Sequence, residues 1–236
     1  VEDKPDVIIN VVAASNLERN LYLTTELIDM SVPMVIDLNM YDELQASGSE
    51  FDYHKLSKMI GIPIIPTVSK SGLGISELFD AAIRVYEETD PTVRYVRIYY
   101  GNTIENSISK LNIELDKTST SFDFPNRYIA IKLLEKDSDI GNYIKSTGKS
   151  EQVLKIRDTE IHNIEETLNE DSESSITNAR YGYISGALKE TYKEKLTESN
   201  ATRVLDAIVT NNYICFPLYF FFRWRMFECT FNLGGY

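Results

Sequence analysis

Three short apolar runs in the first 92 residues, each followed by a stretch of helical spacing, constrain the fold most. The runs are Val7–Val12, Met34–Leu38 and Ile62–Thr67. Short apolar runs of this kind are typical of buried strands. Strands that alternate with helices predict a parallel sheet, because parallel neighbours must be joined by a crossover connection. The N-terminal part of the chain is therefore expected to be an α/β domain.

Local signals predict where the helices begin and end. Ser15–Glu18 matches a capping box at the start of the first helix. A second helix is expected over Asp52–Ile60 and should end at Gly61, because glycine readily adopts the left-handed conformation found at helix C-termini. Ser76 is expected to cap a last helix that ends before Thr89–Thr92. The residues expected to face the sheet are Leu17, Leu21, Leu27 and Ile28 in the first helix, Leu56, Met59 and Ile60 in the second, and Leu78, Phe79, Ala82, Ile83 and Tyr86 in the third.

The loops that follow the three strands are expected to lie together. In a parallel sheet the carboxyl ends of the strands share one edge, and ligands bind at that edge. The loops are Ala13–Asn16, Asn39–Asp42 and Val68–Gly74. This edge is the predicted ligand site.

The second loop, Asn39-Met40-Tyr41-Asp42, has the form of a loop that reads a guanine base. A carboxylate such as that of Asp42 accepts hydrogen bonds from N1–H and the exocyclic amine of guanine, and the Asn39 amide both donates and accepts. Adenine lacks that pair of donors, so the arrangement discriminates between purines. A pattern of four residues also arises by chance, and Asn or Asp after a strand is ordinary turn chemistry.

The third loop offers further contacts to a flat base. Its glycines, Gly72 and Gly74, allow close approach of the backbone, and Ser69 and Lys70 are placed to touch the ligand. A flexible connection between strand and helix explains the same residues. The predicted nucleotide-binding residues are Asn39, Met40, Asp42, Ser69 and Lys70, and no catalytic or metal-binding residue is assigned.

Several longer stretches resemble the family of ferrous iron transport protein B (FeoB), bacterial iron transporters with a fused GTPase domain. The run Asn16–Leu21, Asn-Leu-Glu-Arg-Asn-Leu, is the most specific of them. The other stretches are Ile9–Val12, Asn39–Asp42 and Leu56–Lys58 in the first part, Tyr100–Glu105, Ala130–Glu135 and Ala179–Tyr181 in a part that resembles the family's helical domain, and Thr210–Pro217 and Thr230–Gly234 near its first membrane helix. The resemblance covers nearly the whole chain.

The resemblance implies a GTP/GDP-binding module on the cytoplasmic face of the bacterial inner membrane, which gates passage of Fe(II) through a membrane domain. Family members carry a P-loop of the form GxxxxGK[ST], a switch segment and a D-x-x-G turn before the strand that here opens at Val7, and none of these is present. The P-loop supplies donors and a lysine for the phosphates and a hydroxyl for Mg²⁺. The chain is therefore interpreted as a fragment: Mg²⁺ is expected only in the full-length protein, and GTP hydrolysis by this chain alone is not expected. Val12-Ala13-Ala14 also replaces the family's frequent Val-Asp-Ala.

After Arg94 helical spacing takes over and predicts a small bundle. The expected inward residues are Ile104, Ile108, Leu111 and Leu115 behind Asn102, then Val153, Ile156, Ile161, Ile164 and Leu168, then Ile176, Ala179, Tyr183, Ala187 and Leu188. The predicted division is residues 1–92 for the nucleotide-binding part, 93–199 for the helical domain and 200–236 for a segment that leads into the membrane.

The apolar tail is the basis of the membrane prediction. Tyr213–Phe222 is almost wholly apolar, but a membrane-spanning helix needs about 20 such residues. Arg223, Arg225 and Glu228 interrupt it, and each charge at a helix centre costs roughly 2.5–3.5 kcal/mol. The tail is interpreted as the start of a first membrane helix that needs partner helices. Cys215 and Cys229 both lie in the tail, where membrane packing explains them better than a disulfide framework.

Charge and composition exclude some other functions. A net charge of -12 argues against a nucleic-acid partner, which needs clustered Lys and Arg. His54 and His162 form no metal-ligand pattern with the cysteines, and the acidic run Glu165–Glu173 is expected to be solvated. Three functions remain: a fragment of a GTP-regulated Fe(II) transporter, a non-hydrolysing docking module of a membrane protein, and a response-regulator-like domain. The last leaves Asn16–Leu23 and the tail unexplained.

Overall fold

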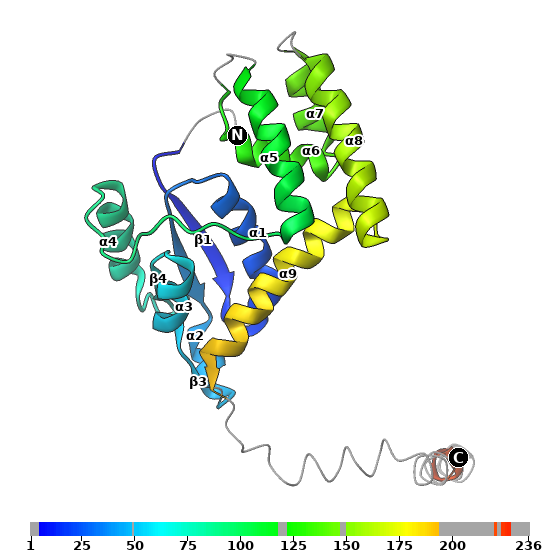
Figure 1. Cartoon of the computed structure of the whole chain (residues 1–236). Helices are drawn as coiled ribbons and strands as arrows, with labels where there is room; N and C mark the ends of the chain where they lie inside the picture. The colour runs from blue at the N-terminus through cyan, green and yellow to red at the C-terminus, as the bar shows by residue number, and fades with distance from the viewer. Residues whose placement is uncertain are drawn as a thin grey trace. The chain divides into compact units, whose positions relative to one another are not determined.

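The computed structural model describes residues 5–48, 50–117, 122–146, 150–193, 220 and 223–227. The chain divides into two compact units, Val1–Lys193 and Glu194–Tyr236. Each unit is described by itself below. Figure 1 shows the whole chain coloured from the N-terminus to the C-terminus.

A parallel three-stranded sheet forms the centre of the N-terminal part (Figure 1). The strands are β1 (Ile8–Ala13), β2 (Met34–Asn39) and β4 (Ile64–Pro66), in the order β1-β2-β4. The predicted α/β class and all three strands are thus confirmed. The third strand is shorter than predicted, and it is bounded by Pro63 and Pro66, neither of which has a backbone N–H to donate.

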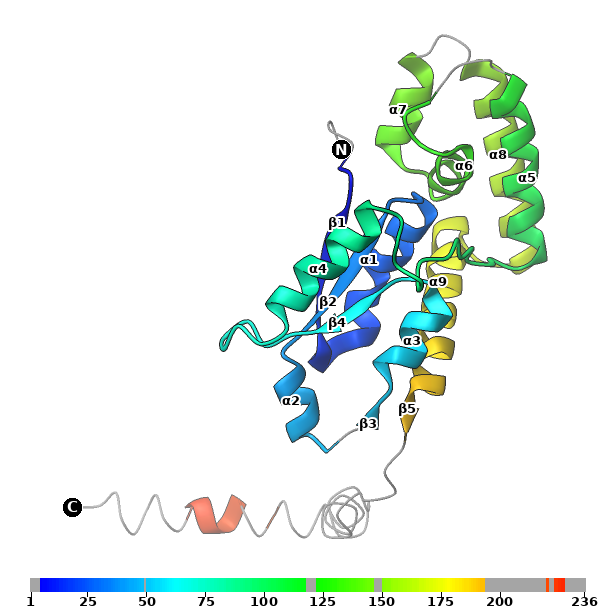
Figure 2. The same ribbon diagram turned by 90° about the vertical axis from the view of Figure 1, so that its left-hand side faces the viewer.

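Helices cover both faces of this sheet. One face carries α1 (Leu17–Asp29), which follows a 3-10 turn η1 (Ala14–Asn16), and α3 (Tyr53–Ile60); the other carries α4 (Ile75–Tyr86) (Figure 2). Strand residues alternate between faces, so Met34, Ile36 and Leu38 of β2 join the α1 side. Val35 joins the α4 side. A short helix, α2 (Tyr41–Ala46), follows β2.

The predicted signals at the ends of α3 are confirmed, and the predicted capping box is wrong. Asp52 caps α3 by accepting a hydrogen bond from the Lys55 backbone N–H at 2.9 Å, and Gly61 ends it with φ of 69°. Helix α1 has no side-chain cap at its start, because η1 brings the chain into the helix instead. Glu18, the expected partner in the capping box, accepts a hydrogen bond from Ser185.

The prediction for the inward face of the last helix of the sheet domain was correct for Leu78 and Ala82 and wrong for its other three residues. Helix α4 starts behind Gly74, with φ of 80°, and not at Ser76. The residues that it buries are Leu78, Ala81 and Val85. The predicted apolar residues Phe79, Ile83 and Tyr86 are 57%, 53% and 64% exposed. Two apolar stripes run along this helix, and the sheet covers the one with the smaller residues.

The C-terminal part of the first unit is helical, as predicted. Its helices are α5 (Asn102–Lys117), α6 (Asn126–Leu134), α7 (Ser138–Ser146), α8 (Ser150–Leu168) and α9 (Ser172–Thr191). The four residues predicted to face inward in α5 are all buried, while Leu168 at the end of α8 is 41% exposed. A second apolar core lies among these helices, built around Ile108, Leu111, Ile129, Leu133 and Leu134.

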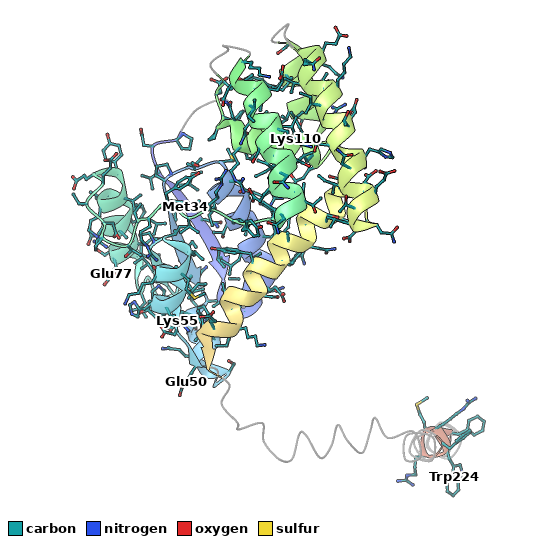
Figure 3. The ribbon with its side chains drawn as sticks, viewed as in Figure 1. Met34, Glu50, Lys55, Glu77, Lys110 and Trp224 are labelled. Atoms are coloured by element: carbon teal, nitrogen blue, oxygen red, sulfur yellow. The ribbon has the colours of Figure 1, made fainter. Side chains whose placement is uncertain are left out.

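Helix α9 belongs to both cores. Ile176 near its start packs in the helical core, whereas Ile184, Ala187 and Leu188 near its end pack against the sheet side. In Figure 1 this helix runs from the other helices down along α1 and α3. It continues into β5 (Tyr192–Lys193), which pairs antiparallel with β3 (Glu50–Phe51). Lys55 of α3, labelled in Figure 3, forms an ion pair with Glu190 of α9 at 3.2 Å.

A buried charge network lies where the helical part meets α1. Its centre is Arg180 of α9, which is 0% exposed. Arg180 Nη2 contacts Asp29 Oδ2 at 3.2 Å, Arg180 Nε donates to the Tyr100 hydroxyl at 3.1 Å, and Arg180 Nη1 pairs with Glu135. Tyr100 in turn donates to Asp29 at 2.5 Å. Burial is the main cause that raises the pKa of Asp29 and of Tyr100.

The second unit is described only at residue 220 and at residues 223–227, which are helical. Most of the predicted membrane segment, including Cys215 and Cys229, therefore lies outside the described residues. None of the helices in the described part of the chain combines the length and the apolar character that crossing a membrane requires.

Candidate base-binding site

The candidate site lies at the carboxyl edge of the sheet, where β2 ends and the loop after β4 turns into α4. Asn39 is the last residue of β2, and Met40 adopts a left-handed conformation with φ of 58° before α2 begins. A non-glycine residue in this conformation is uncommon, and such residues cluster at functional sites. Asp42 follows in the first turn of α2 and is exposed. The Tyr41 backbone N–H donates to the Thr67 carbonyl at 3.2 Å, which joins this turn to the end of β4.

The side-chain oxygen of Asn39 is held by several donors. Asn39 Oδ1 accepts from the Met40 backbone N–H at 2.9 Å, from the Ser69 backbone N–H at 3.2 Å and from the Ser69 hydroxyl at 2.9 Å. This network assigns the orientation of the amide, with the oxygen toward Ser69. Among the described residues no hydrogen bond uses the amide nitrogen, so its two donors remain for a ligand.

The loop between β4 and α4 keeps its shape through glycine and backbone bonds. Val68 and Leu73 form an isolated antiparallel bridge. A Cβ added at Gly74 would lie 2.3 Å from the Pro66 carbonyl oxygen, so only glycine fits there. Gly72 also has a positive φ, of 75°, but open space around it. Close approach of the backbone therefore matters at Gly74, where the loop passes the end of β4.

The five predicted site residues are thus placed as follows. Asn39 and Ser69 are brought together by direct hydrogen bonds, with Met40 between them and α2. Asp42 and Lys70 are exposed on the two neighbouring segments. In the described part of the chain no hydrogen bond joins either of them to the Asn39 side chain.

Two buried residues behind Asn39 were not predicted. Thr67, 0% exposed, donates its hydroxyl hydrogen to Asp37, and the same hydroxyl oxygen lies 3.4 Å from Asn39 Oδ1. Asp37 is 5% exposed, and burial raises the pKa of its carboxyl while the Thr67 hydrogen bond opposes that rise. The sequence did carry a signal: an acidic residue inside the apolar run Met34–Leu38 has to be buried, and a buried carboxyl needs a donor.

No metal site is evident in the residues that the structure describes, since no group of three or more His, Cys, Asp or Glu side chains is arranged to hold an ion. His162 lies beside Glu166, at 3.2 Å. Part of the predicted acidic run is engaged with Lys136, which pairs with Glu165 at 2.7 Å and Asp171 at 2.6 Å. Asp171 also caps α9.

Two family models match the chain. The model of ferrous iron transport protein B matches residues 1–82, and that of the FeoB cytosolic helical domain matches residues 100–193. Together they cover the sheet and most of the helical part.

Curated relatives are longer than this chain. The Fe(2+) transport protein A/Fe(2+) transporter FeoB fusion protein of Porphyromonas gingivalis is 44% identical over 239 residues, which are 100% of this chain and 28% of that protein. The Fe(2+) transporter FeoB of Staphylococcus aureus is 32% identical, over 97% of this chain and 33% of its own length. The chain thus spans about a third or less of the relatives that it matches.

Solved structures agree with both comparisons. A GDP-bound variant of NFeoB from S. thermophilus superimposes with a TM-score of 0.68 at 32% identity, over 79% of this chain and 69% of that one. The mGMPPNP-bound NFeoB from S. thermophilus superimposes with a TM-score of 0.63 at 31% identity, over 84% of this chain and 71% of that one. The cytosolic domain of the T. maritima FeoB, at 24% identity and a TM-score of 0.64, supports the fold alone. With its parallel sheet, its helical part and these matches, the chain belongs to the FeoB family of ferrous iron transport proteins.

Proposed function

We propose that this chain provides the guanine-recognition half of a nucleotide site in a GTP-regulated Fe(II) transporter. The observation that carries the proposal is the anchoring of Asn39. Its oxygen is occupied by Ser69 and Met40, which leaves the amide nitrogen as a directed pair of donors at the edge where ligands bind in parallel α/β sheets.

The chemistry of the neighbouring residues supports guanine as the base. The exposed carboxylate of Asp42 accepts from N1–H and the exocyclic amine of guanine, while the Asn39 amide nitrogen donates to an acceptor on the opposite edge of the purine. Lys70 supplies an aliphatic stem against a flat base and a positive charge near the phosphates. S. thermophilus relatives have been solved with GDP and with mGMPPNP, which favours this assignment.

The phosphates require groups beyond those described. Within the described residues β1 pairs only with β2, so its other backbone edge is free. The unpaired backbone groups of a free strand edge fit a further strand. We place the P-loop, the switch segment and Mg²⁺ binding of the intact protein there, and expect this chain alone to bind GDP weakly and not to hydrolyse GTP.

The relatives' names support a role in Fe(II) transport, and the match to the model of the FeoB cytosolic helical domain supports a place at the cytoplasmic face of the membrane. In this proposal Fe(II) is the ion transported by the intact protein, the apolar tail leads into its membrane domain, and the helical part connects the nucleotide site to that domain. The predicted division at residues 92 and 199 belongs to the same proposal.

A calorimetric titration of GDP into the 236-residue chain, with ADP as the control ligand, tests base recognition. We expect measurable GDP binding, down to millimolar affinity, and none of ADP. Equal binding of both nucleotides would reject the assignment of Asn39 and Asp42. Absence of GDP binding to a folded sample would favour a docking module that no longer binds nucleotide.

A further inference from the structure

The buried carboxyl of Asp37, in the middle of the central strand β2, is not explained by base recognition alone. Asp37 lies two residues before Asn39, so both side chains are on the same face of β2. Its cross-strand neighbours are Val11 of β1 and Ile65 of β4, neither of which offers a side-chain hydrogen bond. Among the described residues, the one hydrogen bond that the Asp37 carboxyl receives comes from the Thr67 hydroxyl.

The Thr67 hydroxyl has one hydrogen and two acceptors within reach. One acceptor is the Asp37 carboxyl, and the other is Asn39 Oδ1 at 3.4 Å. A charged carboxylate outcompetes a neutral amide oxygen for this hydrogen, because charge-assisted hydrogen bonds are the stronger ones. Once the carboxyl is protonated it can donate to the Thr67 oxygen, and the Thr67 hydrogen is then free to turn to Asn39.

We propose that Asp37 is a positioning residue for the base-reading loop, which acts through Thr67 on the amide of Asn39. In the charged state Asp37 keeps the Thr67 hydrogen, and Asn39 Oδ1 is held by Ser69 and Met40 alone. In the protonated state Thr67 adds a further donor to Asn39 Oδ1 and fixes the amide nitrogen toward the ligand. Guanine-nucleotide affinity then rises as the pH falls through the midpoint of Asp37; this consequence rests on the function proposed above.

The surroundings of Asp37 leave this hydroxyl as its main polar partner. Burial raises the pKa of the carboxyl, which brings its titration closer to the neutral range, and the Thr67 hydrogen bond is the opposing cause. Neither β1 nor β4 contains a titratable side chain. The titratable and charged groups on the other elements at this face are exposed, namely Lys70 in the loop and Glu77, Asp80, Arg84 and Tyr86 of α4. Glu77 points outward from α4 in Figure 3.

A pH titration of the 236-residue chain by NMR tests the relay without any nucleotide. The Asp37 carboxyl carbon and the side-chain amide of Asn39 are followed together. We expect one shared midpoint in the unmodified chain. In Asp37→Asn, which cannot ionise, the Asn39 signal should be independent of pH. The matched control Asp80→Asn, which removes an exposed acid, should leave the Asn39 titration intact. If the Asn39 amide signal does not change at the pH at which Asp37 titrates, the proposal is overturned.

GDP titrations at pH values on either side of that midpoint then test the consequence for binding. We expect about three- to tenfold tighter GDP binding by the unmodified chain on the acid side, the range of one neutral hydrogen bond. Asp37→Asn, which cannot ionise, should bind GDP with the same affinity at both pH values. Thr67→Val keeps the acid but removes the hydroxyl, so a pH dependence that survives in a folded Thr67→Val chain would refute the relay. Shared NMR midpoints without any GDP binding would uphold the relay and reject the proposed function instead.

Discussion

Replacing Arg180 with Met should destabilise the chain more than any exposed charge change. The guanidinium is fully buried, and its removal leaves the carboxylate of Asp29, which is 2% exposed, without its cation, while Glu135, which is 8% exposed, keeps Lys132 at 3.0 Å. Breaking a buried ion pair by removing one partner costs about 3–5 kcal/mol, because an uncompensated charge remains in the interior. Because Asp29 is the partner left without a cation, the expected loss lies within that range, about 3–5 kcal/mol.

The measurement is the free energy of unfolding from urea denaturation followed by circular dichroism. The matched control is Lys155→Met, whose partner Glu151 lies 2.8 Å away and whose pair is exposed on both sides, at 66% and 85%. Exposed pairs contribute about 0–1 kcal/mol, so the control should change little. Because burial already raises the pKa of Asp29, losing Arg180 should raise it further, and the loss of stability should become smaller as the pH falls and the carboxyls are protonated.

A combined variant separates the charge argument from packing. Adding Asp29→Asn to Arg180→Met removes the stranded charge, and most of the lost stability should return. A loss below about 1 kcal/mol for Arg180→Met, or no recovery in a folded combined variant, would refute the reasoning that uncompensated charge is the cause.

Three further predictions concern the sheet edge. Asp42→Asn should weaken GDP binding about tenfold or more in calorimetry, since a charge-assisted hydrogen bond contributes roughly 1.5–3 kcal/mol, and Asp80→Asn should not; equal effects would argue against base contact. Gly74→Ala should lower the free energy of unfolding by at least about 1 kcal/mol more than Gly72→Ala, because both have a positive φ but only Gly74 meets the Pro66 carbonyl. Because burial raises the pKa of Asp37 in the folded chain, its protonated form stabilises the fold at low pH, and that contribution is lost as the pH rises through the folded-state pKa. The melting temperature of Asp37→Asn relative to the unmodified chain should therefore increase with pH. A difference in melting temperature that is the same at every pH would contradict this.

The sequence was most informative where one local rule decides the outcome. The strand Met34–Leu38 and the helix stop at Gly61 follow from apolar runs and from the left-handed preference of glycine, and both are confirmed. The inward face of α4 was predicted wrongly at three positions because Phe79, Ile83 and Tyr86 are as regularly spaced as Leu78, Ala81 and Val85. Spacing alone cannot decide between two apolar stripes; packing against Val35 of β2 and its neighbours does.

Local sequence rules could not predict the contacts between segments that are distant in the chain. Asn39 was singled out from its place after a strand, but its bond to Ser69 spans 30 positions and depends on where β4 ends. Arg180 lies in a helix whose first part packs in one core and whose last part packs in the other, so no single apolar stripe marks its face. Its partners Asp29 and Tyr100 are 151 and 80 positions away. Buried polar side chains of this kind become visible only once the partners are placed.

The two polar clusters of the first unit lie at opposite ends of the same elements. Asn39, Thr67 and Asp37 lie toward the carboxyl ends of the strands, whereas Asp29 ends α1 and thus lies at the end of α1 away from η1. Helix α9 contacts both ends of α1: Arg180 bonds to Asp29, and five residues later Ser185 bonds to Glu18 in the first turn of α1. A change in the loop after β1 that shifts α1 should therefore be felt at both Ser185 and Arg180, two of the contacts that join the sheet and the helical part.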